Sequence, residues 1–442
     1  MRSLAKAPDG IPRTWSLPGP DGILVGVGPN VDGSRFVALT PKAIIEGRTR
    51  SRPAVPLIIG LVLAGAGALL VMISYFVLDG ATNTILSTFM ALPVGAMVIG
   101  GLLWLDRFEP EPPLKLLFAF LWGCGVAALV ALVVNTLGIA VLSSELGVRG
   151  GLVLGSSFLA PVVEESLKGS VLLILLWRRR DEINGVTDCV LYAGMVAIGF
   201  AVIEDINYFA QALQQSGEAA VVTWVVRTIF GPIGHPAFTA ATGVGIAYAA
   251  TARRGAKGVL AVIGGWCVAV FLHMSWNLGS QFGLIGLGTS LSFILSWIAV
   301  LVVLLVFDRR RLIGTIQRFL PQYIPTGIVT PADIAMLSNL RARREARRAV
   351  RSRLGAPAAR AMADYQLAAT ELALLHASAS TRTVSPQRFA FRQQGLTYLM
   401  GRARQVFNPP PYPAPPRVPG PRPGPWQGPP GGLPGPSQPP HR

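Results

Sequence analysis

The stretch GLVLGSSFLAPVVEESLKGSVLLILLW, residues 151–177, is long and apolar enough to cross a bilayer, yet it carries two glutamates and a lysine near its middle. About 20 predominantly apolar residues suffice for a membrane-spanning helix. A charge at bilayer depth costs several kcal/mol even on lenient scales, so such residues normally face a cavity or a polar partner. Glu164, Glu165 and Lys168 therefore predict a polar site inside a membrane helix.

The rest of the chain has the same apolar character. Of its 442 residues, 51% are hydrophobic and only 14% are charged, which is typical of polytopic membrane proteins. Apolar runs of roughly 20 residues predict about eight transmembrane helices, so the expected class is an all-α polytopic membrane protein. The approximate limits of these runs are 57–78, 85–105, 114–142, 151–177, 186–210, 221–250, 259–277 and 284–307.

The distribution of arginine predicts the orientation. Arginine-rich segments precede the first predicted span and follow the fourth, sixth and eighth, whereas the segments after the first, third, fifth and seventh contain a single arginine between them. By the positive-inside rule, both chain ends lie in the cytosol. The formal net charge of +17 is concentrated in these runs and in one C-terminal stretch, which favours a membrane surface over nucleic acid as the partner.

The chain divides into four predicted parts. Residues 1–54 form a loosely structured cytosolic N-terminal segment, and residues 55–310 form the transmembrane domain. Residues 311–407 form a basic helical region, in which Thr330 is placed to cap a helix and RARREARRAVRSR begins a helical hairpin that binds anionic lipid on the inner leaflet. Residues 408–442 are rich in proline and glycine and are expected to be disordered.

Three further polar clusters lie within predicted spans. Glu204 and Asp205 are in the fifth span, His235 is in the sixth, and His273 precedes Asn277 by four residues in the seventh. Polar residues within membrane helices usually face the interior of the bundle, where they pair with one another or line a pathway. All three clusters are therefore candidates for the same site as the glutamate pair.

The predicted topology places the key residues at similar depth. Counting about 1.5 Å per residue from each cytosolic end puts Glu164 roughly 20 Å, His235 roughly 22 Å and His273 roughly 21 Å into the membrane. Glu204 lies roughly 27 Å in by the same count. Unrelated polar positions would scatter across a core about 30 Å thick. We therefore expect the fourth, sixth and seventh helices to bring these groups into one chamber.

Prolines and glycines suggest local breaks near the site. Pro161 is expected to open a helix, which would leave the two glutamates near a helix N-terminus. Gly231, Pro232 and Pro236 are expected to interrupt the sixth helix beside His235.

The residue types allow two mechanisms. Two glutamates in one apolar pocket suit proton transfer to and from water, with histidine and asparagine as hydrogen-bond donors to an oxyanion. Alternatively, a divalent metal such as zinc activates the water, and its candidate ligands are Glu164, Glu204, His235 and His273. The spacing of the residues does not separate these two mechanisms, and no other cofactor is indicated.

The segments EESLK, DEINGVTDCVLYAGMVAIGFAVIEDINYF, HPAFTAATG and HMSWN, in this order, resemble motifs of the PrsW family of intramembrane proteases, which is related to the CAAX prenyl endopeptidase superfamily. The resemblance covers roughly residues 55–310. It implies a multi-pass protein of the cell membrane that cleaves a single-pass, membrane-anchored protein near its extracytoplasmic side. In the best-known member of the family, the substrate is an anti-sigma factor.

The resemblance also implies the site residues. The family's functional positions correspond here to Glu164, Glu165, Glu204, His235, His273 and Asn277. One position departs from the family, because Asp205 stands where asparagine is often found. The additional carboxylate could strengthen metal binding or simply titrate.

Other functions fit parts of the pattern. Buried carboxylates and broken helices also mark proton-coupled transporters, although the chain has no evident internal repeat. A non-catalytic membrane scaffold would use the arginine-rich tail to recruit partners. In either case the buried ion pairs and histidines would be structural or would move protons, and no peptide would be cut.

Overall fold

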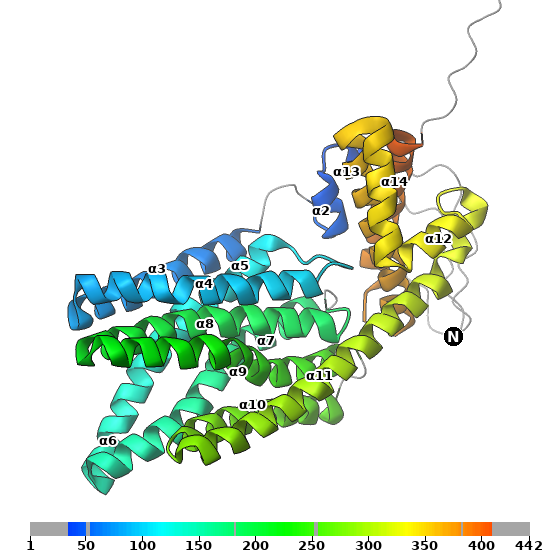
Figure 1. Ribbon diagram of the computed structural model, residues 1–442. Helices are drawn as coiled ribbons and strands as arrows, with labels where there is room; N and C mark the ends of the chain where they lie inside the picture. The colour runs from blue at the N-terminus through cyan, green and yellow to red at the C-terminus, as the bar shows by residue number, and fades with distance from the viewer. Residues whose placement is uncertain (1–33, 50–53, 181–182, 252–254, 382, 409–442) are drawn as a thin grey trace, which may run out of the picture.

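The computed structural model describes residues 34–49, 54–180, 183–251, 255–381 and 383–408. Within these ranges all regular structure is helical and no strand occurs, which confirms the all-α class. Figure 1 shows a bundle of long helices with a smaller helical group at one end. The proline-rich segment that was expected to be disordered lies outside the described residues from 409 onward.

The bundle contains the long helices from α3 to α11. α3 (Val55–Asp79) and α4 (Ala81–Leu105) come first, and α5 (Pro113–Leu121) runs through a π-helical turn, η1 (Trp122–Ala127), into α6 (Ala128–Leu154). A second π-helical turn, η2 (Gly155–Leu159), leads into α7 (Ala160–Arg179). The remaining helices are α8 (Val186–Gln215), α9 (Gly217–Thr251), α10 (Ala256–Ser280) and α11 (Gly283–Phe319).

Six described helical stretches are long and apolar enough to cross a membrane, as expected for a multi-pass membrane protein. One of them, Pro113–Trp177, has 65 residues and contains two of the predicted spans. The chain turns within it at Gly147, whose φ of 74° is strained for residues other than glycine. In Figure 1, α6 leaves the bundle and the chain returns through η2 to α7. The six stretches are Val55–Asp79, Ala81–Leu105, Pro113–Trp177, Val186–Gln215, Ala256–Ser280 and Gly283–Phe319.

α8 is the central helix of the bundle. In its most apolar window 89% of the residues are buried, whereas the corresponding share is 11% in α11. α8 packs against α4, α9, α5 and η1, and small residues allow the closest of these approaches. A Cβ atom on Gly123 would lie 2.0 Å from the carbonyl oxygen of Val196, so the η1 and α8 backbones are in direct contact. α8 therefore provides a buried, closely packed wall for the side chains of the site.

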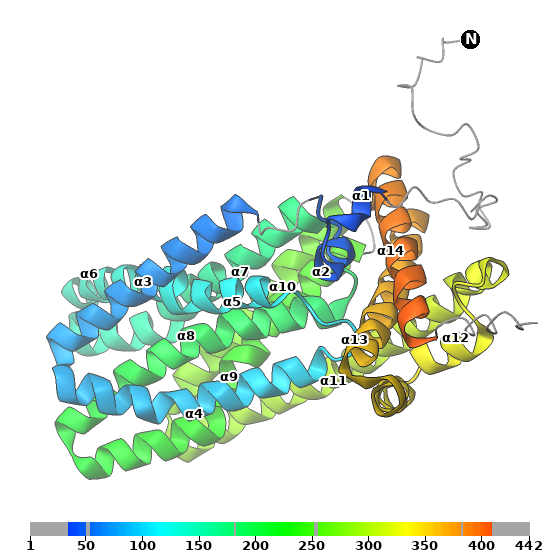
Figure 2. The same ribbon diagram turned by 90° about the horizontal axis from the view of Figure 1, so that it is seen from above.

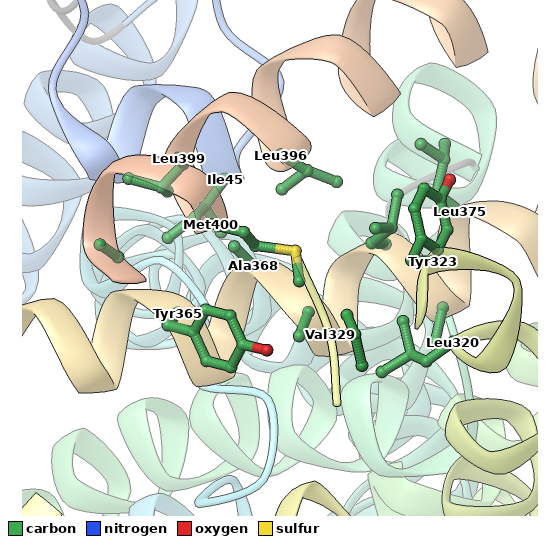
Figure 3. Close-up of a cluster of buried hydrophobic side chains, with 14 of the residues drawn as sticks. Ile45, Leu320, Tyr323, Val329, Tyr365, Ala368, Leu375, Leu396, Leu399 and Met400 are labelled. Carbon is green, nitrogen blue, oxygen red and sulfur yellow. The ribbon is translucent and has the colours of Figure 1, made fainter. Parts of the chain in front are cut away.

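The smaller group, which we call the C-terminal helical unit, has its own apolar core. It consists of α2 (Pro41–Ile45), the last turns of α11, η4 (Pro321–Thr326), α12 (Pro331–Leu337), α13 (Leu340–Ser380) and α14 (Pro386–Phe407). Figures 1 and 2 place this unit at one end of the membrane bundle, joined to it by α11. Figure 3 shows side chains from α2, α13 and α14 meeting in the core.

The N-terminal residues that the structure describes belong to this unit. Phe36, Ile44 and Ile45 are buried in the same core as α13 and α14. The expectation of a loosely structured lead is therefore wrong for residues 34–45. These residues form helices of four and five residues, too short for the 3.6-residue periodicity on which sequence prediction depends.

The predicted cap at Thr330 is confirmed. Its Oγ1 accepts from the Asp333 amide at 3.1 Å, and the Asp333 carboxylate accepts from the Thr330 amide at 2.8 Å. The predicted hairpin lies within α13, which turns at Gly355 (φ 83°) so that Arg343 contacts Gln366 and Thr370. α13 packs on the core of the unit together with α14, and its arginines do not all face outward. Arg343 is only 3% exposed and donates to the carbonyls of Leu337 and Phe108, so it joins the unit to the loop after α4.

Replacing Arg343 with leucine is expected to destabilise the docking of this unit by about 3 kcal/mol, because three hydrogen bonds of a buried guanidinium are lost, including one to Thr370 at 2.8 Å. Hydrogen exchange of the α13 amides measures the effect. Arg341→Leu is the matched control. That side chain is exposed and pairs with Glu345 on the surface, so its loss should leave exchange unchanged. Equal effects of the two substitutions would contradict the assignment.

A buried histidine should make the stability of the unit depend on pH. Burial lowers the pKa of His376 to about 4, and its Nε2 accepts from the Tyr323 hydroxyl at 2.7 Å. The unfolded chain binds a proton near pH 6.5 and the folded unit does not, so stability is greatest above pH 6.5 and falls as the pH drops toward 4. The loss should be roughly 2 kcal/mol at pH 5 and approach roughly 3 kcal/mol near pH 4. Unfolding measured by hydrogen exchange at pH 7 and pH 5 should show it, and His376→Gln should remove that part of the pH dependence.

Candidate active site

α7 places the charged residues of the opening motif inside the bundle. Lys168 is 0% exposed, and its Nζ donates to Glu164 Oε2 at 3.3 Å and to Glu165 Oε1 at 3.0 Å. Spacings of three and four residues bring all three groups to one face of the helix. The ammonium also lies 4.0 Å from the centroid of the Phe200 ring on α8. These three side chains form a centre to which the other helices contribute.

His273 on α10 contacts both glutamates. Its Nδ1 is 3.0 Å from Glu165 Oε1, and its Nε2 is 3.8 Å from Glu164 Oε2. An ionised carboxylate only accepts hydrogen bonds, so Nδ1 carries the proton and Nε2 turns its lone pair toward Glu164. Glu165 accepts further bonds from Lys168 and, at 2.8 Å, from the Thr239 hydroxyl. Glu165 is thus fully engaged in holding its neighbours.

His235 on α9 is oriented in a similar way. Its Nδ1 lies 3.1 Å from Lys168 Nζ, and its Nε2 lies 2.9 Å from Glu204 Oε2. Because an ammonium group has no acceptor, Nδ1 must accept this bond and Nε2 must donate to the glutamate. The ring meets that of His273 edge to face, with 5.0 Å between centroids. Both histidines therefore present an unprotonated nitrogen to the same region.

Glu164, His235 and His273 form a group that fits a metal ion. One donor atom of each residue lies within 4.8 Å of the others, and all three side chains are buried. Two imidazole nitrogens and a carboxylate are the donor set of several catalytic zinc sites. A carboxylate holds the second nitrogen of each histidine, Glu204 for His235 and Glu165 for His273, as is usual around histidine ligands of metals.

The formal charge of the cluster supports the same conclusion. Four carboxylates and two cations meet here, so with neutral histidines the sum is −4 + 2 = −2. A buried charge of this size is costly unless a divalent cation or two protons balance it. The carboxylates are Glu164, Glu165, Glu204 and Asp205, and the cations are Lys168 and Arg227.

Glu204 lies beside the donor group and supports it. Its Oε2 is occupied by His235 and by Arg227, so it is not among the three residues whose donor atoms converge. The adjacent Asp205 pairs with Arg227 through the guanidinium Nε. The additional carboxylate of this chain therefore faces an arginine.

Asn277 serves the backbone of η2. In the wide register of this π-helical turn the Ala160 amide bonds to the Gly155 carbonyl, five residues back. The corresponding partner of the Ser156 carbonyl is Pro161, which has no N–H. The Asn277 Nδ2 donates to that carbonyl instead, at 2.9 Å. The structure thus does not bring the Asn277 amide into the hydrogen-bonded cluster of glutamates and histidines.

Two expected breaks are absent. Helical dihedrals continue from α6 through η2 into α7, so the glutamates do not lie at a free helix N-terminus. Pro161 follows the π-helical turn η2 within a continuous helix and does not start a new one. α9 is likewise unbroken from Gly217 to Thr251, although it contains Pro232 and Pro236. Within a bundle a helix tolerates proline where neighbouring groups satisfy the freed carbonyls.

Three residues of the site escaped the sequence analysis. Arg227 on α9 bridges Glu204 and Asp205, Thr239 holds Glu165, and Asn135 on α6 donates to Glu164 Oε1 at 3.3 Å. Thr239 follows His235 by four residues and Arg227 precedes it by eight, so a search for polar residues on the histidine face of the helix could have found both. Asn135 shares no pattern with the other site residues.

The fold and this buried group are accompanied by a match to a known family. The sequence profile described as PrsW family intramembrane metalloprotease matches residues 111–307. This segment is a PrsW-family domain. It runs from the loop before α5 into α11 and contains every charged member of the cluster. The match confirms, for this segment, the resemblance seen in the four motifs. Comparison with curated proteins and with solved structures gave no match.

Proposed function

We propose that this PrsW-family domain hydrolyses peptide bonds of single-pass, membrane-anchored proteins, with water activated at the Glu164–His235–His273 group. The observation that carries the proposal is the convergence of these three side chains, from three helices, on one point inside an apolar bundle. Each histidine is also held in a tautomer that leaves one ring nitrogen unprotonated: His235 Nδ1, which accepts from Lys168 at 3.1 Å, and His273 Nε2, which lies 3.8 Å from Glu164. A set of structural ion pairs would not require this arrangement.

The hydrogen bonds of each residue indicate its role in the proposed reaction. A divalent metal such as zinc, when bound, polarises the scissile carbonyl and lowers the pKa of the attacking water. His235 Nδ1, His273 Nε2 and one Glu164 oxygen would hold it, and Lys168 would release its hydrogen bond to His235 Nδ1. The other Glu164 oxygen accepts from Asn135 at 3.3 Å, and among the described residues no further hydrogen bond to it occurs. It has the capacity to take a proton from the water and deliver it to the leaving amine as the C–N bond breaks. Glu165 keeps His273 in the productive tautomer.

We further propose eight membrane crossings with both chain ends in the cytosol. The crossings would be α3, α4, α5 with α6, η2 with α7, and then each of α8, α9, α10 and α11. The C-terminal helical unit, which includes the N-terminal helix α2, lies at the end of the bundle where α11 emerges with its arginine run. The cell membrane is the proposed location.

The proposed cleavage position is near the extracytoplasmic side. Glu204 and Arg227 are the more exposed members of the cluster, with 20% and 17% of their side chains accessible, and they lie toward the α8–α9 connection. Under the proposed topology that connection is extracytoplasmic. An anti-sigma factor is the proposed substrate by family resemblance alone.

The exposed arginines at the start of α13 are proposed to bind anionic lipid of the inner leaflet. Binding of the purified protein to vesicles with and without anionic lipid tests this, and equal binding would contradict it. The arginines concerned are Arg341, Arg344, Arg348, Arg351 and Arg353.

The decisive experiment compares membrane proteins in wild-type cells and in cells carrying Glu164→Ala. A single-pass protein should accumulate uncut in the variant. Purified wild-type protein should cleave that substrate, lose activity on chelation and recover it with zinc. If no protein accumulates, or if the variant changes only ion or solute uptake, the peptidase proposal fails. Cleavage that persists through complete metal removal would instead show that the carboxylates act without a metal.

A further inference from the structure

Arg227 connects the acidic residues of α8 with the histidine of α9. Its Nη2 donates to Glu204 Oε2 at 2.5 Å, and its Nε donates to Asp205. The guanidinium carbon lies 4.2 Å from the centroid of the Tyr208 ring. These three partners occupy positions i, i+1 and i+4 of α8, so one helix holds the arginine from three directions.

The arginine holds the oxygen that orients His235. Glu204 Oε2 accepts from Arg227 and, at 2.9 Å, from His235 Nε2. A planar guanidinium with fixed donors restricts a carboxylate more tightly than an ammonium does. The Glu204 side chain is 20% exposed, so without the arginine its carboxylate could turn toward water. His235 would then lose one of the two hydrogen bonds that keep the proton on Nε2, and the bond from Lys168 to Nδ1 would remain.

We propose that Arg227 is a positioning residue of the active site. Through Glu204 it keeps His235 in the tautomer with the proton on Nε2 and an unprotonated Nδ1, and Asp205 is the anchor that keeps Arg227 in place. Asp205, which stands at the position that departs from the family pattern, would thus stabilise Arg227. The inference rests on the proposed function for the role of Nδ1 as a metal ligand. The tautomer of His235 can be measured without any metal.

The first test measures zinc affinity of the purified full-length protein by chelator competition. Arg227→Gln is expected to raise the dissociation constant about 10-fold, the lower end of the range for residues that orient metal ligands. Asp205→Asn should raise the dissociation constant by a smaller factor. The dissociation constant of Arg227→Lys should lie between those of the wild type and Arg227→Gln. Arg149→Gln is the matched control, because Arg149 is exposed at the outer end of α6. It should leave the affinity unchanged.

The second test reads the imidazole tautomer by ¹⁵N NMR of the metal-free protein, with His235 assigned by comparison with His235→Gln. Wild type and Arg149→Gln should show the proton on Nε2, and Arg227→Gln should show a mixture of tautomers. An unchanged tautomer together with unchanged zinc affinity in Arg227→Gln would overturn the inference. Equal losses of affinity in Arg149→Gln and Arg227→Gln would also overturn it, since they would indicate a general effect of charge. If the tautomer shifts as expected but wild-type protein cleaves nothing, the peptidase proposal fails and the positioning role of Arg227 stands.

Discussion

Glu164→Gln is expected to lower kcat for cleavage of a membrane-anchored peptide by about 10³-fold, within the range for loss of a positioned general base. The amide has nearly the shape of the carboxylate but cannot take a proton from water, and it is a poor metal ligand. Glu164 is the sensitive position because one of its oxygens has only a 3.3 Å contact with Asn135, whereas Glu165 is saturated with donors.

The same substitution should not reduce stability. It removes one negative charge from a buried cluster with a formal charge of −2, and this relieves repulsion among the carboxylates. We therefore expect Glu164→Gln to be inactive and at least as resistant to thermal unfolding in detergent as the wild type, a pattern typical of active-site substitutions. Glu145→Gln, at an exposed position of α6, is the control and should keep full activity. A Glu164→Gln enzyme with more than a tenth of wild-type kcat would exclude the base assignment.

The sequence was sufficient to place the main groups of the site. Three helices with arginine-marked ends put Glu164, His235 and His273 at one depth, and the structure brings their donor atoms within 4.8 Å of one another. Depth could be predicted because the bilayer fixes the length of each helix and the positive-inside rule fixes its direction. Rotation about the helix axis is not fixed in this way. For this reason Asn277 lies at the expected depth but donates its hydrogen bond to the η2 backbone.

Contacts between distant segments were beyond the sequence. Asn135 reaches Glu164 only because α6 folds back against η2 and α7, and no spacing within α6 signals this. The burial of Phe36 against α14 is similar, because the partner surface lies more than 350 residues further along the chain. Proline also misled the analysis. Pro161 and Pro236 remove backbone donors, but the surrounding bundle keeps both helices continuous.

Lys168→Met should produce the largest loss of stability. The ammonium is 0% exposed and contacts Glu164, Glu165 and His235 Nδ1, so its removal leaves two buried carboxylates without their cation. Breaking a buried ion pair by deleting one partner costs about 3–5 kcal/mol. Unfolding of the purified protein in detergent, followed by intrinsic tryptophan fluorescence, measures this loss.

The double variant Glu165→Gln with Lys168→Met separates charge from packing. Removing both partners of a buried pair costs much less than removing one, so the double variant should recover most of the stability that Lys168→Met loses. Both variants should be inactive, because His273 loses its carboxylate in the double variant and the glutamates lose their cation in the single one. If Lys168→Met unfolds like the wild type, the lysine does not compensate the carboxylates in the folded protein. If the double variant is as unstable as the single one, the lysine acts through packing against Phe200, and the charge balance assigned to this cluster is incorrect.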